Sequence, residues 1–324
     1  VPVGLCLSSG TDSTLLLFLL NELGVKNINT FTYGFIESKY NEIRKVKNSR
    51  LNNNIIHNSR IITPFNFLKN LEKAIFQFET PLGGLGTLGL WQLFSLAKEK
   101  KIPVILSGEG LDETFAGYKY YIYYYLYDLI IEKKFDLINN NLKNIKKNFG
   151  LVFESKKDFF NKFSKINNTP LMAPDSTFLS GDNFLSNIYK EKFNIKYPKT
   201  TKISNLSFLK QRMFDDIFIY KIPKLLSYLD RSSMSWGVES RVPFIDNNLL
   251  NHTFKISSNN FFKNSTNKYI PKKLLKKFNY YLKNNQNKLF VSTPQREWLK
   301  YKIDNKMAEP IYGKVLLLDY ENIF

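Results

Sequence analysis

Two polar loops, each directly after an apolar stretch, carry the residues best suited to chemistry. The first is "LCLSSGTDST" at residues 5–14, which contains Ser8, Gly10, Asp12 and Ser13. A tight Ser/Gly turn at the start of a helix presents backbone N–H groups and the positive end of the helix dipole to a phosphate. A side-chain N-cap is the plainer interpretation, and this loop alone leaves both open. Because Asp12 would repel bare phosphate, its presence favours a bridging Mg²⁺.

The second loop, "ILSGEGLDETFAGY" at residues 105–118, holds three carboxylates, Glu109, Asp112 and Glu113, among glycines. Carboxylates that face a nucleotide can hold Mg²⁺, and a further one can act as a general base. An exposed acidic loop is the alternative. That alternative does not explain why the acidic residues follow a buried strand and precede a helix.

The elements that must position these loops alternate between strand and helix. We predict strands at 1–9, 27–35, 54–62 and 102–110, and helices at 12–24, 39–52, 65–78 and 90–101, with a glycine-rich loop at 79–89. This alternation predicts an α/β fold with a doubly wound, mostly parallel sheet. Since ligands bind beyond the carboxyl ends of such strands, both loops are expected at one edge.

The chain changes character after the tyrosine-rich stretch at 118–138, which is predicted to be helical. We place a soft boundary near residue 130, with a nucleotide-binding core at 1–130 and a mainly helical remainder at 131–324. The glycine-rich stretch at 82–89 is a candidate cover for the site.

Composition narrows the function classes. Residue Cys6 is the only cysteine, which excludes an internal disulfide and suits a reducing cytoplasm. With only two histidines, the chain is poorly equipped for metal sites that need several histidine ligands. No apolar run of membrane-spanning length occurs, so no membrane association is expected. The net charge is +19, but the lysines are scattered among asparagines, so a nucleic-acid partner is not expected.

Four segments together resemble the synthetase domain of the asparagine synthetase family, which is an N-type ATP pyrophosphatase, or PP-loop, domain. They are "SSGTDS", "LSGEGLDETFAGY", "LDRSSMSWGVESRVPFID" and "NKYIPKKLLKKF", in family order and at family spacing. The resemblance implies ATP and Mg²⁺ as cofactors. The residues that match ATP or pyrophosphate contacts are Cys6, Ser8, Gly10, Asp12, Ser13, Tyr33, Ser107 and Gly108.

The same resemblance assigns further roles. Asp12 and Asp112 match metal ligands, Glu109 matches the base for ammonia, and Lys268 matches the lysine that stabilises charge on the reacting phosphate. Substrate-binding roles are implied for Glu113, Asp230, Arg231, Glu239 and Arg241.

The activity implied is ATP-dependent adenylation of a carboxylate, with the aspartate β-carboxylate as the default, followed by attack of ammonia. Glutamine is the expected ammonia source. No glutaminase domain lies within this chain, and because Val1 begins directly on an apolar strand, we expect such a domain or subunit N-terminal to it. A homodimer is a candidate assembly.

Three alternatives stay open. One is an amidotransferase of surface-polysaccharide biosynthesis, one is a PP-loop tRNA-modifying enzyme, and one is a non-catalytic nucleotide-binding protein. The segment at 80–100 favours the first, and the net charge of +19 favours the second. The third is favoured by two departures from the family pattern, Ser9 in place of a glycine and Pro271 with Lys272 in place of Leu-Arg.

Overall fold

The structure is a computed structural model. It describes residues 1–47, 54–80, 82–151, 155–167, 200–263, 266–277, 293–295 and 297–298. The chain forms two compact units that are interleaved along the sequence. Unit 1 consists of Val1–Gly108, Leu225–Pro243 and Leu275–Phe324, and unit 2 consists of Glu109–Lys224 and Phe244–Leu274. The soft boundary near residue 130 stays a prediction.

Unit 1 is built on a five-stranded parallel sheet with the order β3-β2-β1-β4-β5. The strands are β1 (Val3–Cys6), β2 (Ile28–Phe35), β3 (Ile55–Ile62), β4 (Val104–Leu106) and β5 (Glu239–Arg241). Apolar and β-branched residues dominate β1 to β4, as a sheet covered on both faces requires. The doubly wound α/β prediction is therefore confirmed.

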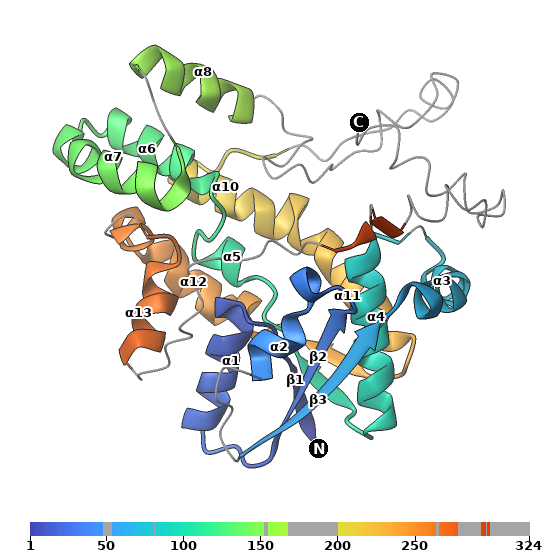
Figure 1. The fold of residues 1–324 in the computed structure, drawn as a ribbon. Coiled ribbons are helices and arrows are strands. Elements are labelled where there is room, and N and C mark those ends of the chain that lie inside the picture. The colour runs from blue at the N-terminus through green and yellow to red at the C-terminus, as the bar shows by residue number, and fades with distance from the viewer. Residues whose placement is uncertain are drawn as a thin grey trace, which may run out of the picture. The chain divides into compact units, whose positions relative to one another are not determined.

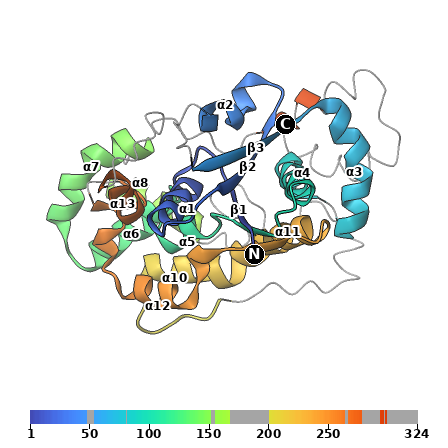
Figure 2. The same ribbon diagram turned by 90° about the horizontal axis from the view of Figure 1, so that it is seen from below.

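The helices of unit 1 cover both faces of this sheet. They are α1 (Thr11–Glu22), α2 (Glu42–Lys47), α3 (Pro64–Phe78), α4 (Leu85–Glu99) and, in its larger part, α11 (Ile222–Met234). Figure 1 and Figure 2 show α1 and α4 on opposite faces of the sheet. Four of the predicted helices are present, although the one predicted at 39–52 is helical only over Glu42–Lys47 in the described residues.

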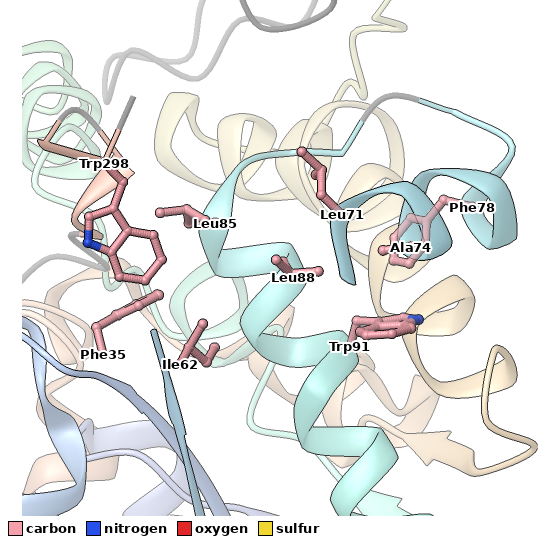
Figure 3. Close-up of a cluster of buried hydrophobic side chains, with 9 residues drawn as sticks. All are labelled: Phe35, Ile62, Leu71, Ala74, Phe78, Leu85, Leu88, Trp91 and Trp298. Atoms are coloured by element: carbon pink, nitrogen blue, oxygen red, sulfur yellow. The ribbon is translucent and has the colours of Figure 1, made fainter. Parts of the chain in front are cut away.

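A cluster of buried side chains joins the sheet to α3 and α4. Figure 3 shows Phe35 of β2 and Ile62 of β3 facing α4, with Leu88 between the sheet and α3. Phe35 and Ile62 are register partners on adjacent strands. Each fully buried Leu, Ile or Phe contributes about 1.5–3 kcal/mol relative to exposure. This cluster therefore fixes the register of β2 and β3, and with it the loop edge of the sheet.

The loop predicted at 79–89 is wrong from Leu85 onward, because α4 begins there. Gly89 lies inside the helix, and a side chain at that position would come within 2.4 Å of the Tyr33 ring. The glycine serves close packing of the helix on β2 rather than a loop. Leu85 and Leu88 are buried in the core, so this half of the stretch is not a cover over a site.

Strand β5 has no counterpart in the predicted elements. It consists of the polar residues Glu239–Arg241, which carry no alternating apolar pattern. It forms because β4 offers an edge, where Val104 pairs with Glu239 and Leu106 with Arg241. Such non-local pairing leaves no mark in a short sequence window.

Unit 2 is helical. Its elements are α5 (Leu111–Thr114), α6 (Tyr121–Ile131), α7 (Phe135–Phe149), α8 (Lys156–Asn167), α10 (Phe208–Asp215), η2 (Asp216–Tyr220), α12 (Asn247–Lys255), η4 (Ser258–Asn260) and most of α13 (Tyr269–Lys277). Two further short turns are η1 (Ser38–Tyr40) and η3 (Pro243–Ile245). The mainly helical character predicted for the later chain is confirmed for the described residues. Residues 168–199 and those from 299 lie outside them.

The tyrosine-rich helix α6 packs inside unit 2. Tyr121, Tyr124 and Tyr125 are buried, and the Tyr125 ring lies 4.9 Å from that of Phe262. The tyrosines therefore fill the core of the unit, as expected for a packed helix.

A fully buried carboxylate ties α6 to α10 and the following π-helical turn η2. Asp216 accepts hydrogen bonds from the Tyr120 and Tyr121 hydroxyls at 2.7 and 2.8 Å. It also accepts two from Arg212, at 3.2 and 2.8 Å. Because every partner is a donor, the ionised carboxylate is well satisfied in the absence of water.

Candidate active site

The loop after β1 is folded back on itself by two serines. The Ser8 N–H donates to Ser13 Oγ at 3.0 Å, and Ser13 Oγ donates to the Ser8 carbonyl at 3.0 Å. The Gly10 N–H donates to Ser8 Oγ at 3.1 Å. These bonds close the chain into a tight turn around the start of α1, which is the geometry that a phosphate cradle needs.

The N-cap interpretation of this loop is wrong. Gly10 occupies the N-cap, with φ −78° and ψ 159°, and none of the described side chains caps this helix end. The helix therefore begins with the acidic Asp12 in its first turn and with Ser13 turned back toward Ser8.

Ser9, which replaces a family glycine, adopts an ordinary backbone conformation. Its φ is not positive. A glycine is needed where the chain enters the left-handed region or where another atom approaches closely, and the first of these conditions does not hold at Ser9. The serine therefore places no left-handed strain on the turn.

The loop after β4 packs directly against the start of α1 within unit 1. An added Cβ on Gly108 would lie 3.0 Å from the Ser13 nitrogen and 3.1 Å from the Asp12 Cβ. Ser107 is buried and its N–H donates to the Arg241 carbonyl at 2.8 Å. Strands β1 and β4 are neighbours, with Leu5 opposite Leu106. The structure thus brings Ser107 and Gly108 to Asp12 and Ser13, as two adjacent parallel strands require.

Cys6 and Tyr33 lie on adjacent strands at the same edge. Cys6 is half-buried at the end of β1 and packs beside a cluster that includes Phe31. The Thr32 hydroxyl of β2 donates to the carbonyl of Leu7, the residue after β1, at 2.6 Å, and so holds the end of β1 against β2. The resemblance assigns the backbone groups of Cys6 and Tyr33 to the nucleotide, and this assignment stays a prediction.

The charged residues of the segment 229–246 lie on α11 and β5 and are largely exposed. Glu239 and Arg241 form an ion pair of 3.4 Å with side chains 48% and 64% exposed, a geometry worth little energy. Asp230 is exposed and Arg231 half-buried near the end of α11. The buried members of the segment are Leu229, Ser232, Ser233, Val238 and Phe244. The substrate-binding roles implied for its charged residues stay a prediction.

In unit 2 the acidic loop becomes helix α5, which starts at a left-handed glycine. Gly110 has φ +91°, and a side chain there would come within 2.3 Å of Ile245. Glu109, just before it, is half-buried. Within α5, Asp112 lies beside Lys268, with Nζ 2.6 Å from Oδ1 and side chains 4% and 14% exposed for the lysine and the aspartate. Removing either charge would leave the other buried without compensation.

Glu113 faces a second buried group. Its carboxylate accepts a hydrogen bond from the Tyr118 hydroxyl at 2.7 Å, and it is 1% exposed. Burial, together with the negative charge of Asp112, raises the pKa of Glu113 to about 8. The Lys221 ammonium lies 3.5 Å from the centre of the Tyr118 ring and is itself buried. Glu113 thus belongs to a desolvated polar cluster of the kind often found at functional sites.

Tyr118 and Lys221 were not among the predicted site residues. Tyr118 ends the "FAGY" part of the acidic loop. Because it lies only five residues after Glu113, the sequence could have suggested that the two side chains are close. Lys221 follows the π-helical turn η2, where its N–H donates to the Asp216 carbonyl at 2.9 Å. Nothing in the local sequence predicts that turn, because π-helical turns arise from tertiary packing.

Mg²⁺ is the metal that the family resemblance implies. The described part of the chain contains no group of three or more His, Cys, Asp or Glu side chains that could hold a metal. Mg²⁺ needs only one or two carboxylates, because it keeps several waters and takes phosphate oxygens. Asp12 in unit 1 and Asp112 in unit 2 are each a carboxylate, which is the ligand type that Mg²⁺ takes.

Comparison with known proteins identifies the family of this chain. The family model described as asparagine synthase matches residues 1–311. The chain belongs to the asparagine synthase family. An asparagine synthetase [glutamine-hydrolyzing] 1 from Bacillus subtilis is 28% identical over 95% of this chain and 48% of its own length. A putative asparagine synthetase [glutamine-hydrolyzing] from Mycobacterium tuberculosis is 23% identical over 93% of this chain and 46% of its own length.

A third relative, putative asparagine synthetase [glutamine-hydrolyzing] 2 from Methanocaldococcus jannaschii, is 30% identical over 40% of this chain and 25% of its own length. This member of the asparagine synthase family thus spans about half the length of the first two relatives. In its described residues, no helix is long and apolar enough to cross a membrane.

Proposed function

We propose that this chain is the synthetase part of an ATP-dependent amide ligase. It would join a carboxylate, by default the β-carboxylate of aspartate, to AMP with release of pyrophosphate, and then transfer ammonia to the acyl group. The observation that carries the proposal is the serine turn at the start of α1, which has glycine at the N-cap, is held by Ser8 and Ser13, and packs against Gly108. Membership of the asparagine synthase family supports the same reaction.

The serine turn would bind the phosphates of ATP. The first-turn N–H groups of α1 are donors of the kind that bind phosphate, and the hydrogen bonds between Ser8 and Ser13 would hold the turn in place before ATP arrives. Donors that need no rearrangement stabilise developing charge most effectively. Cys6 and Tyr33 on β1 and β2, and Ser107 with Gly108 after β4, would border the nucleotide through their backbone groups.

Mg²⁺ would be held by Asp12 and Asp112 together with phosphate oxygens. When bound, it supplies positive charge that lowers the energy of the departing pyrophosphate. The ammonium group of Lys268 would offset charge on the reacting phosphate, and its burial makes that interaction stronger than in water. A bond forms between the substrate carboxylate oxygen and the α-phosphorus as the bond to pyrophosphate breaks.

Amide formation needs a proton acceptor. The nitrogen of ammonia attacks the acyl carbon, AMP leaves, and the nitrogen sheds one proton to the Glu109 carboxylate. Glu113, Asp230, Arg231, Glu239 and Arg241 remain candidates for contacts to the carboxylate substrate.

The ammonia source is proposed from the relatives. Their names describe them as glutamine-hydrolyzing, and this chain spans about half of their length. A glutaminase domain or subunit N-terminal to this chain would therefore supply ammonia. We place the reaction in the cytoplasm, where ATP and glutamine are available.

The direct test is release of pyrophosphate from ATP that depends on an added carboxylate, with ammonium chloride as the nitrogen source. Asp12→Ala and Asp112→Ala are expected to lower this rate by at least about 100-fold. Asp136→Ala is the matched control, because Asp136 is also an aspartate in the first turn of a helix but is exposed on α7. Pyrophosphate release that survives both site variants would refute the assignment.

A second candidate keeps the chemistry and changes the substrate. The segment 80–100 resembles the branch of the family associated with surface-polysaccharide assembly more than the common asparagine-forming enzymes. A panel of aspartate, glutamate and uronic acids in the same assay decides between them. Stimulation of pyrophosphate release by tRNA, weakened by salt, would instead favour a tRNA-modifying enzyme.

A further inference from the structure

The turn before α13 holds Lys268 in an unfavourable position. Its φ is +50°, and the residue is 3% exposed. A non-glycine residue in the left-handed region costs about 1–2 kcal/mol. Burying a lysine ammonium adds a larger penalty unless the charge is paired. Such a conformation persists only when the surroundings impose it, so other residues must hold Lys268 against Asp112.

Asn267 provides one such restraint. Its side-chain amide Nδ2 donates a hydrogen bond to the Gly117 carbonyl. The Gly117 N–H in turn donates to the Asp112 carbonyl at 2.7 Å. Two hydrogen bonds therefore connect the residue before Lys268 to the backbone of Asp112. The ion pair between the side chains of Lys268 and Asp112 is a separate connection between the same two segments.

Lys272 fixes the orientation of the Asn267 amide. Its Nζ donates to Asn267 Oδ1 at 2.8 Å, and its N–H donates to the Lys268 carbonyl at 3.0 Å. A lysine can only donate and a backbone carbonyl can only accept. Only one orientation of the amide satisfies both neighbours, with Oδ1 toward Lys272 and Nδ2 toward Gly117.

The departures from the family pattern in this segment have a physical explanation. Pro271 lies in the first turn of α13, where its missing N–H removes no bond within the helix. Lys272 stands where the family has arginine and supplies the single donor that Asn267 requires. Pro271 and Lys272 are therefore compatible with an ordered segment and do not indicate that its function has been lost.

We propose that Asn267 is a positioning residue that holds Lys268 on Asp112, and that Lys272 acts through Asn267. This inference rests on the proposed function, because Lys268 gains its importance from the reacting phosphate. Asn267 itself touches neither ATP nor the carboxylate substrate in this proposal. Its hydrogen bond to Gly117 holds the turn that contains Lys268 in the conformation in which the Lys268 ammonium contacts Asp112.

The kinetic test compares Asn267→Ala and Lys272→Met with Lys273→Met, a matched control on an exposed lysine of the same helix. Asn267→Ala is expected to lower kcat for pyrophosphate release about 10- to 100-fold, since small misplacements of a charged group have effects of that size. The KM for ATP should change by less than about 3-fold, and Lys272→Arg should restore most of the loss seen in Lys272→Met.

A double-mutant cycle separates positioning from general damage. If Asn267 acts through Lys268, the double variant Asn267→Ala/Lys268→Met loses no more activity than Lys268→Met alone. If the loss of activity in the double variant equals the product of the two single losses, the proposal is overturned. So would a kcat for Asn267→Ala equal to that of Lys273→Met.

Hydrogen exchange tests the restraint without any reaction. The amides of Gly117 and Lys272 should exchange about 10-fold faster in Asn267→Ala than in wild type, and at the wild-type rate in Lys273→Met. Unchanged exchange at both amides refutes the restraint even in an active ligase. A wild-type protein without carboxylate-dependent pyrophosphate release refutes the proposed function instead, while faster exchange in the variant still supports the restraint.

Discussion

Replacing Gly117 by alanine places one methyl group directly on the buried ion pair. An added Cβ would lie 1.8 Å from Asp112 Oδ1 and 2.2 Å from Lys268 Cε. The backbone itself would accept alanine, because Gly117 is not among the glycines with positive φ. The whole effect of the substitution therefore comes from displacing the two charged side chains.

The expected loss of stability follows from two limits. If the pair moves aside together, the penalty is that of overpacking, about 1–3 kcal/mol. If Asp112 and Lys268 are forced apart, each buried charge loses its partner, and the penalty rises to about 3–5 kcal/mol. We therefore expect Gly117→Ala to lower the free energy of unfolding by about 2–4 kcal/mol, between the two limits.

The neighbouring residue supplies the matched control. Ala116 is buried and has φ +51°. Ala116→Gly removes about 1–2 kcal/mol of left-handed strain. It also loses about 0.8 kcal/mol of methyl burial and adds backbone freedom worth about 0.5–1 kcal/mol to the unfolded chain. These contributions nearly cancel, so Ala116→Gly should stay within about 1 kcal/mol of wild type.

Calorimetric melting distinguishes the two variants. At about 2–4 °C per kcal/mol for proteins of 150–250 residues, Gly117→Ala should melt several degrees below Ala116→Gly. Pyrophosphate release should fall in Gly117→Ala in parallel. A Gly117→Ala protein that melts within 1 °C of wild type, or an Ala116→Gly protein that is the less stable of the two, would refute the packing argument.

Three further outcomes follow from the structure. Asp216→Asn leaves Arg212 buried without its counter-ion and should lower the free energy of unfolding by about 3–5 kcal/mol in urea titrations, whereas a loss below about 1 kcal/mol would contradict this. Burial raises the pKa of Asp215 to about 6 from an ordinary 3.8. Between these two pH values the Asp215 carboxyl is therefore protonated in the folded chain and ionised in the unfolded chain. Wild-type stability should therefore fall as pH rises from about 4 to 6, by up to about 1.4 kcal/mol per unit from this group, and Asp215→Asn should flatten that part of the profile in melts across pH. Ser9→Gly should change the KM for ATP by less than about 2-fold and lower stability by about 0.5–1 kcal/mol, since no left-handed residue is replaced; a tenfold tighter KM would show that the serine does distort the turn.

Much of unit 1 was predictable because its signals are local. The apolar runs of β1 to β4 alternate with helical periodicity, and parallel pairing brings loops at the carboxyl ends to one edge. The closeness of Gly108 to Ser13 follows from that rule alone. The length of α4 was not predictable. A glycine, Gly89, lies inside this helix because a side chain there would collide with the Tyr33 ring, and Tyr33 is far away in the sequence.

The roles of the charged residues divide in the same way. Motif resemblance selected Asp112 and Lys268, and the structure pairs them. It also selected Asp230 and Glu239, which the structure leaves exposed. Burial depends on which distant segments pack over a side chain, and a motif carries no record of that packing.

The sequence alone determined the turn chemistry of this protein: a Ser/Gly loop before a helix, a carboxylate loop after a strand, and a fold that sets both at strand ends. Tertiary structure decided how the charges are held. Asn267 contacts Gly117 across 150 residues of chain and is itself held by Lys272, and Lys221, which follows a π-helical turn, contacts Tyr118. Hydrogen bonds and burial act over a few ångströms in space, so residues far apart in sequence acquire their roles only when the chain folds.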